Sequence, residues 1–235
     1  MDSSRSRLPL LSFGGALSLA LGVATIGCAG ARQAEVDDSW LARVPPENLS
    51  GVYEARASFR QSRDEVTRAE VARQDAEREL GVARLERDAA QAHAEAGKAV
   101  VEAARAKGQA GGIQAAQRDL REAEMALSVA EAQVQWREEQ VDAREAEREW
   151  KARLADVDRA KLSLAEYQAL KEAGDVRAAQ LSEAEFREAV AKAQKEAAEE
   201  QKDVEKERRE AQNAHARWTQ RQQSLEGYGG SGPTQ

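Results

Sequence analysis

Apolar residues recur every seven positions along most of the chain, which is the pattern of a coiled-coil helix. Between residues 47 and 107 this stripe consists of Val52, Phe59, Val66, Leu80, Ala94 and Val101, with Arg73 and Arg87 at the two remaining positions. Three residues after each position comes a small side chain: Ala55, Ser62, Ala69, Ala76, Ala83, Ala90, Gly97 and Ala104. Small side chains let a neighbouring helix approach closely. We therefore predict a first helix over residues 47–107, packed tightly against an antiparallel neighbour.

A second helix is predicted over residues 113–173, because Gly108 and the pair Gly111-Gly112 interrupt the periodicity before it. It carries two stripes at sevens: Ile113, Leu120, Leu127, Val134 and Val141, and separately Trp136, Ala143, Trp150, Val157 and Leu164. The stripes are offset by two residues, or about 200° around a helix, so they face nearly opposite ways. We expect this helix to have a neighbour on each side.

A third helix is predicted over residues 183–226, after a break at Gly174. It keeps the same spacing through Val190, Ala197, Val204, Ala211, Trp218 and Leu225. A flexible tail is expected over residues 227–235, where glycine dominates. The predicted fold class is all-α, either a long coiled-coil helical hairpin or an elongated three-helix bundle.

Composition agrees with long helices and argues against a catalytic globule. Charged residues make up 33% of the chain and aromatic residues only 4%, and there are four prolines. The net charge is −7, and basic residues alternate with acidic ones without forming a basic face, so nucleic acid is not an expected partner. The sequence shows no catalytic triad, metal-ligand cluster or phosphate-binding loop, and its two histidines, His93 and His215, stand far apart. We expect no enzymatic activity, no cofactor and no small-molecule substrate.

The start of the chain has the pattern of an export signal. Arg5 and Arg7 precede an apolar stretch that runs from Leu8 to Gly27. The segment Ala24-Thr25-Ile26-Gly27-Cys28 resembles the lipobox of bacterial lipoproteins. That resemblance implies that residues 1–27 are a signal peptide, that the thiol of Cys28 carries a lipid, and that Ala29, which is not Asp, directs the product to the outer membrane.

Two other interpretations of this region stay open. Ala29-Gly30-Ala31 could be an ordinary signal-peptidase site, and residues 8–31 are long enough to form a transmembrane helix. Residues 28–46 have few periodic apolar positions and end in Pro45-Pro46, so we predict a tether there. Trp40 and Leu41, within the tether, are expected either to pack on the helices or to lie among lipid headgroups.

The turn before the third helix resembles the hairpin tip of periplasmic adaptor (membrane fusion) proteins, within a similarity over about residues 115–215. Ser182 and Glu185 have the spacing of a capping box, flanked by Leu181 and Phe186 as a hydrophobic staple. Glu166 stands where the family favours a basic residue. The resemblance implies a partner-docking tip formed by Tyr167, Leu170, Gly174, Leu181, Ser182 and Phe186.

The expected function is that of a membrane-anchored lipoprotein acting as a structural spacer or scaffold in the bacterial cell envelope. Its lipid anchor would lie in the outer membrane, its helices in the periplasm, and its partners would be envelope proteins. The alternative is an adaptor-like accessory subunit of an export, secretion or motility complex. The interface between two neighbouring helices is called a seam below. Because seams rich in alanine bury little apolar area, we expect either great helix length or self-association to supply stability.

Overall fold

A computed structural model describes residues 36–229, in which the only regular structure is helical. The long helices are α2 (Ser50–Lys107), α3 (Ala110–Glu172) and α4 (Glu183–Gly229). The short ones are α1 (Asp38–Leu41) and two 3₁₀ helices, η1 (Pro46–Leu49) and η2 (Val176–Gln180). The described residues contain no strand, which confirms the predicted all-α class.

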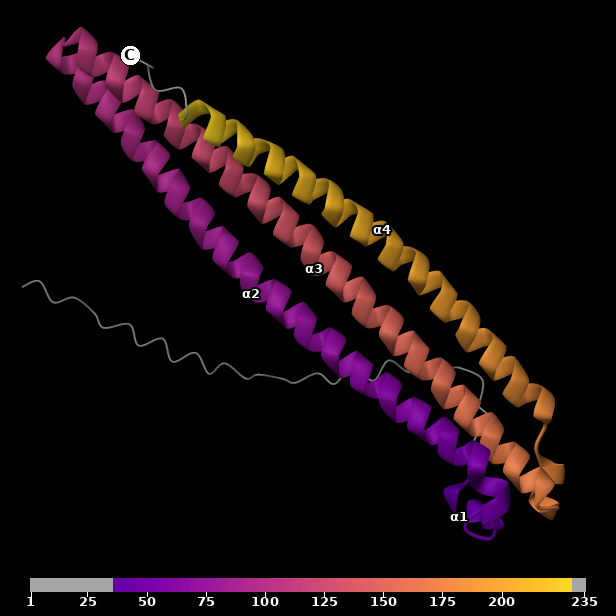
Figure 1. The fold of residues 1–235 in the computed structure, drawn as a ribbon. Coiled ribbons are helices and arrows are strands. Elements are labelled where there is room, and N and C mark those ends of the chain that lie inside the picture. Colours follow the sequence, from indigo (N-terminus) through magenta and orange to yellow (C-terminus); the bar gives the residue numbers. More distant parts are fainter. Residues whose placement is uncertain (1–35, 230–235) are drawn as a thin grey trace, which may run out of the picture. The chain divides into compact units, whose positions relative to one another are not determined.

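The three long helices lie side by side with α3 in the middle (Figure 1). α3 packs antiparallel against α2 on one side and against α4 on the other. Within the described residues, the backbones of α2 and α4 do not approach each other. This region therefore consists of two long helical hairpins that share α3. With 58, 63 and 47 residues, the three helices are about 87, 95 and 70 Å long.

The seam between α2 and α3 follows the predicted stripes. All sixteen positions predicted for the first helix are buried or partly buried. Ala83 is 1% exposed and Ala94 is 2% exposed. At Gly97, an added Cβ would lie 3.2 Å from the Cδ1 atom of Leu120, so the two helices approach closely there. The predicted tight antiparallel packing is confirmed.

The two stripes of α3 face different neighbours, as predicted. Val134 of the first stripe packs with Leu80 and Ala83 of α2. Val157 of the second stripe packs with Ala193 and Ala197 of α4. An α-helix with apolar residues on nearly opposite faces can bury both only between two partners, and this explains why α3 is central.

The turn between α2 and α3 contains only Gly108 and Gln109. Gly108 has φ +69°, a left-handed conformation that glycine adopts without a Cβ penalty, and its N–H donates to the carbonyl of Arg105 at 3.0 Å. The prediction that Gly111 and Gly112 also interrupt the helix is wrong, because both lie in the first turn of α3. Packing against α2 outweighs the low helix propensity of two glycines near a helix start.

The opposite turn is built around Gly174, whose φ is +68°. The N–H of Asp175 donates to the carbonyl of Leu170 at 3.0 Å, and that of Gly174 donates to the carbonyl of Lys171 at 3.1 Å. This pair of bonds is a Schellman motif, which satisfies carbonyls left free at the end of α3. α4 then begins at Glu183, as predicted, and runs to Gly229, three residues past its predicted end. The rest of the predicted tail lies outside the described residues.

Ion pairs link the long helices along both seams. Lys151 Nζ lies 2.7 Å from a carboxylate oxygen of Glu65, between α3 and α2. Arg153 Nε lies 3.5 Å from a carboxylate oxygen of Glu200, between α3 and α4. Partly exposed pairs of this kind contribute about 0–1 kcal/mol each. They specify which residues face each other more than they stabilise the fold.

Candidate functional site

The predicted lipidation site, Cys28, lies outside the described residues, so its lipidation remains a prediction. The other predicted site residues all lie around the turn at Gly174. This end of the helical unit, where α2 begins, α3 ends and α4 begins, is called the base below. It is the richest apolar region that the structure describes.

Nine buried residues form one cluster at the base. This basal core consists of Val36, Leu41, Val44, Val52, Tyr167, Ala169, Leu170, Ala178 and Phe186. Leu170 is 0% exposed and Phe186 is 1% exposed. The rings of Tyr167 and Phe186 stack with their centroids 5.1 Å apart, which joins the end of α3 to the start of α4. Two aromatic rings and a buried leucine thus make this end a packed core.

Three of the six residues predicted to form a partner-docking tip have almost no exposed surface to offer a partner. Tyr167, Leu170 and Phe186 are buried, in an apolar cluster that also contains residues of the segment before α2. Leu181 and Ser182 are partly buried, with Leu181 packed on the basal core as a staple residue would be. Gly174 forms the left-handed turn and presents no side chain.

Residues 36–46, which were predicted to be part of a tether, are folded and pack on the helices. Asp37 caps α1 by accepting a hydrogen bond from the N–H of Ser39 at 2.8 Å. Val36, Leu41 and Val44 are 4%, 6% and 6% exposed, so the segment is packed along its length. Trp40 packs on the basal core, so it lies on the helices. Residues 28–35 of the predicted tether lie outside the described residues.

A polar layer surrounds the basal core. The guanidinium of Arg177 lies 5.2 Å from the ring centroid of Trp40, and its Nε donates to Asp175 Oδ1 at 2.8 Å. The hydrogen bonds from Arg177 lower the pKa of Asp175 to about 2. The cation–π contact and the hydrogen bonds thereby connect Trp40, η2 and the turn.

A buried carboxylate also ties the N-terminal segment to α3. Glu166 is 6% exposed, and one of its oxygens accepts a hydrogen bond from Arg56 at 3.1 Å. The same guanidinium donates to Asp38 of α1 at 2.8 Å. Buried charges require such partners. The acidic residue at position 166, where the adaptor proteins favour a basic one, therefore has an internal structural role.

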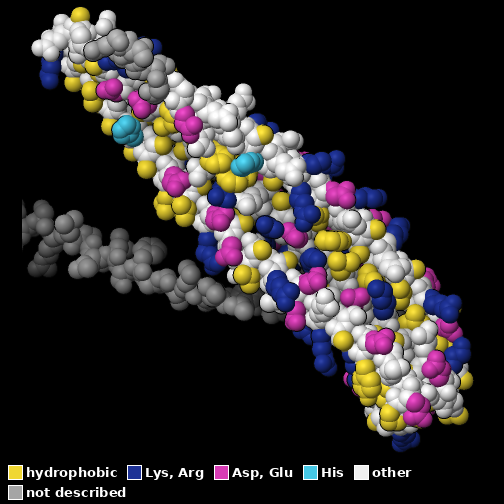
Figure 2. Space-filling view, in the orientation of Figure 1, with side chains coloured by type: hydrophobic (Ala, Val, Ile, Leu, Met, Phe, Trp, Pro, Cys, Tyr) yellow, Lys and Arg dark blue, Asp and Glu magenta, His cyan; other side chains and the backbone are white. Residues whose placement is uncertain are grey.

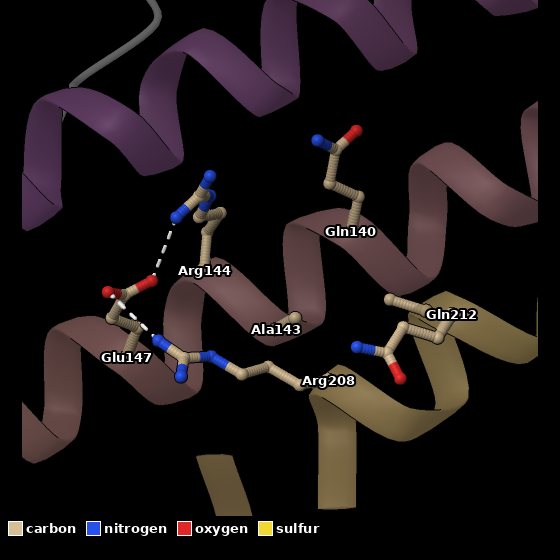
Figure 3. Close-up of a pocket in the computed structure, with 7 residues that line it drawn as sticks. Gln140, Ala143, Arg144, Glu147, Arg208 and Gln212 are labelled. Atoms are coloured by element: carbon tan, nitrogen blue, oxygen red, sulfur yellow. Dashed lines mark hydrogen bonds and ion pairs between the residues drawn. The ribbon is translucent and has the colours of Figure 1, made fainter. Parts of the chain in front are cut away.

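A second candidate site is a shallow groove between α3 and α4, of about 200 Å³ (Figure 3). Glu147 lies in it between two guanidinium groups, 2.9 Å from Arg144 and 3.2 Å from Arg208. Gln140 and Gln212 flank the groove, and Ala143 lies between the charged side chains and the glutamines. These lining residues satisfy one another electrostatically and include no nucleophile. The groove is a place where α3 and α4 pack less closely and polar side chains fill the space between them.

Next to this groove, acidic side chains from both helices gather. Carboxylate oxygens of Glu139, Glu207 and Glu210 lie within 4.8 Å of one another, close enough to share a proton or a cation. Burial and the neighbouring carboxylates raise the pKa of Glu139, which Arg217 opposes. Burial and the charges of Glu207, Glu138 and Glu210 raise the pKa of Asp142 in the same way. Like charges thus oppose one another at the middle of this seam.

An aromatic cluster lies farther along the same seam. The rings of Trp136 and Trp218 stack at 4.7 Å, and the ring of His215 lies 4.6 Å from Trp136. These contacts agree with the predicted stripes, which place Trp136 and Trp218 between helices.

Comparisons with protein families, with curated proteins and with solved structures give no match to this chain. Among residues 36–229, no helix has an apolar stretch long enough to cross a membrane.

Proposed function

We propose that this chain is a lipid-anchored spacer or scaffold of the bacterial cell envelope, with its anchor at Cys28 and its working surface along the helices that extend from it. The lipobox-like sequence around Cys28 supports outer-membrane anchoring. The helices then project into the periplasm and contact envelope proteins.

The observation that best supports the proposal is that the N-terminal segment packs at one end of the long helices. Residues 36–49 pack on the basal core, at the opposite end of α2 from the turn at Gly108. Cys28 precedes Val36 by eight residues, which span at most about 28 Å. The turn at Gly108 lies beyond 58 residues of helix, about 87 Å from the base. If the base is anchored, the helices therefore keep the turn at Gly108 at a fixed distance from it.

The alternative is an adaptor-like accessory subunit of an export, secretion or motility complex. Of the six residues predicted to form its docking tip, Tyr167, Leu170 and Phe186 are buried within the chain. A surface for such docking would have to come from exposed residues of the same turn, such as Val176, which is 81% exposed.

Anchoring is tested by fatty-acid labelling of the wild-type chain and of Cys28→Ser. We expect the label only in the wild type, and unprocessed precursor in the variant. Ala29→Asp is the matched control, because we expect it to keep the label and move the protein from the outer to the inner membrane fraction. Normal processing of Cys28→Ser at Ala31, with release into the periplasm, would contradict the lipid anchor.

Reach is tested with a photoreactive amino acid at position 109 or at position 176. The spacer proposal expects adducts with an envelope protein from position 109. Removing one heptad from α2 and one from α3 next to the turn shortens both helices by about 10 Å, keeps their seam in register, and should abolish those adducts. Adducts from position 176 instead would support the adaptor alternative.

A further inference from the structure

α2 carries a second apolar stripe besides the one that packs on α3. Seven apolar residues follow one another at alternating steps of three and four over its second half: Val82, Leu85, Ala89, Ala92, Ala96, Ala99 and Ala103. All seven are exposed. Val82 and Leu85 are 55% and 71% exposed, and the adjacent Val100 is 56% exposed. Over this span, a stripe of five alanines and two larger apolar side chains therefore faces solvent at coiled-coil spacing.

This stripe, called the outer face of α2, points away from the α3 seam. The seam residues Ala83, Ala94 and Val101 are 1%, 2% and 4% exposed, and each lies about 100° to 200° around the helix from the nearest outer-face positions. Among residues 36–229, α4 makes backbone contacts with α3 and none with α2, so it does not cover the outer face (Figure 1). Figure 2 shows hydrophobic side chains along the edge of the molecule that this half of α2 forms. Within the described residues, nothing packs on it.

The charges beside the outer face distinguish between the two ways in which a second copy can pair. In a parallel, in-register coiled coil, the residue just before position 82, 89, 96 or 103 of one copy lies beside the residue five positions later in the other copy. Asp88 then faces His93, and Glu102 faces Lys107. In an antiparallel pair the acidic residues Asp88, Glu95 and Glu102 would face one another, and like charges in register disfavour pairing. The parallel arrangement pairs Glu102 with a basic residue and sets no acidic residues against each other, so the charges favour two parallel copies.

We propose that the outer face of α2 pairs with the same face of a second copy, in parallel and in register, over residues 82–103. The five alanines let the two helices approach closely, while Val82 and Leu85 pack against their equivalents. A twofold axis parallel to α2 relates the copies, and both bases lie at the same end. Two copies anchored in one membrane have this orientation, although the pairing itself does not require the anchor.

Disulfide crosslinking in the full chain tests the register. Ala89→Cys, Ala96→Cys and Ala103→Cys are introduced one at a time, with the wild-type chain as the control for Cys28. We expect each variant to form a disulfide-linked dimer, because each position faces itself in a parallel pair. Gln91→Cys, on another exposed side of the same helix, is the matched control and should crosslink far less. Crosslinking at only one of the three positions, or no more than at position 91, would overturn the proposal.

Light scattering on the purified full chain provides an independent test. Leu85→Asp should halve the measured mass, while circular dichroism shows unchanged helix content, because Leu85 is exposed in the single chain. Gln91→Glu should leave the dimer mass intact. A monomeric wild type, or a Leu85→Asp variant with the dimer mass, would overturn the pairing. The same measurement on Cys28→Ser separates it from the lipid anchor, since we expect that variant to remain dimeric even if anchoring fails.

Discussion

The ring of Tyr167, five residues before the end of α3, stacks on the ring of Phe186 in the first turn of α4, with centroids 5.1 Å apart. Both rings belong to one apolar cluster that joins α1, the start of α2 and the α3–α4 turn. This cluster contains the largest fully buried side chains among the described residues, Phe186 and Leu170. It should therefore be the main local source of stability at the base.

Truncating Phe186 should strongly weaken the base. We expect Phe186→Ala to lower the free energy of unfolding by about 3–5 kcal/mol, because the lost ring leaves a cavity that packed neighbours cannot fill. Val176→Ala at the same turn is the control, and its 81% exposed side chain should matter by less than about 0.5 kcal/mol. Urea denaturation followed by circular dichroism measures both. Equal effects of the two substitutions would mean that the basal core does not exist.

Two glycines inside α2 should respond differently to the same substitution. Gly81 has no atom within 4 Å of an added Cβ, so Gly81→Ala should raise the free energy of unfolding by about 0.5–1 kcal/mol through helix propensity. Gly97→Ala should gain less or lose stability, because its Cβ would lie 3.2 Å from Leu120 Cδ1. Thermal and urea denaturation compare the two variants. An equal gain at both positions would show that α2 and α3 do not approach closely at Gly97.

The acidic cluster should make the α3–α4 seam more stable at lower pH. The pKa of Glu139 is raised in the folded chain, so its proton is held more tightly there than in the unfolded chain. Stability therefore falls as the pH rises from the unfolded pKa, near 4.5, through the raised folded value, and stays lower above it. We expect Glu139→Gln to stabilise the protein at pH 7 and to have little effect near pH 4.

The control for this cluster is Glu131→Gln, on an exposed part of α3, which should change the free energy of unfolding by less than about 0.5 kcal/mol. Denaturation at several pH values tests both variants. A Glu139→Gln variant that is less stable than the wild type at pH 7 would show that the carboxylate makes a favourable contact instead.

Asp175 should have the opposite pH dependence. Its pKa is lowered to about 2 by hydrogen bonds from Arg177, so the ionised form favours the folded turn. This contribution is fully present above the unfolded pKa, near 3.8, and disappears as the pH falls through about 2. Asp175→Asn should therefore destabilise the base at pH 7 and have a much smaller effect near pH 2. Proteolysis at the turn, measured over this pH range with an acid-stable protease, would detect the difference.

The sequence predicted the helices well because the signal is local and periodic. The sixteen seam positions of α2 and the two stripes of α3 follow from spacing alone, since a side chain repeated every seven residues must stay on one face of a helix. The stripes of α3 also predicted two neighbours and thus its central place. Helix starts were less predictable, because at Gly111 and Gly112 the contribution of packing against α2 exceeds the local propensity of glycine.

The burial of residues at the base was not predicted, because the residues that pack together there are distant in sequence. Tyr167 and Leu170 look alike in a sequence whether they are exposed for a partner or buried, and the residues that cover them lie more than 100 positions earlier. A usable signal was present in and just after the predicted tether, where Val36, Leu41, Val44 and Leu49 recur at steps of three to five around a helix-capping Asp37. The ion pair of Arg56 with Glu166 depends on the same contact and could not be anticipated without it.

Away from the basal core, α2 and α4 of the described region both pack on α3 and make no backbone contact with each other, so either outer helix can detach there while the other hairpin stays closed. The two seams are thus energetically separable, and opening need not be all-or-none. Amide hydrogens of α3 should exchange with solvent last, since both seams must open to free that helix completely. A force applied between the base and the turn at Gly108 would be shared by α2 and α3, because both span that distance. α4 could separate from α3, starting at its C-terminal end, without changing that distance.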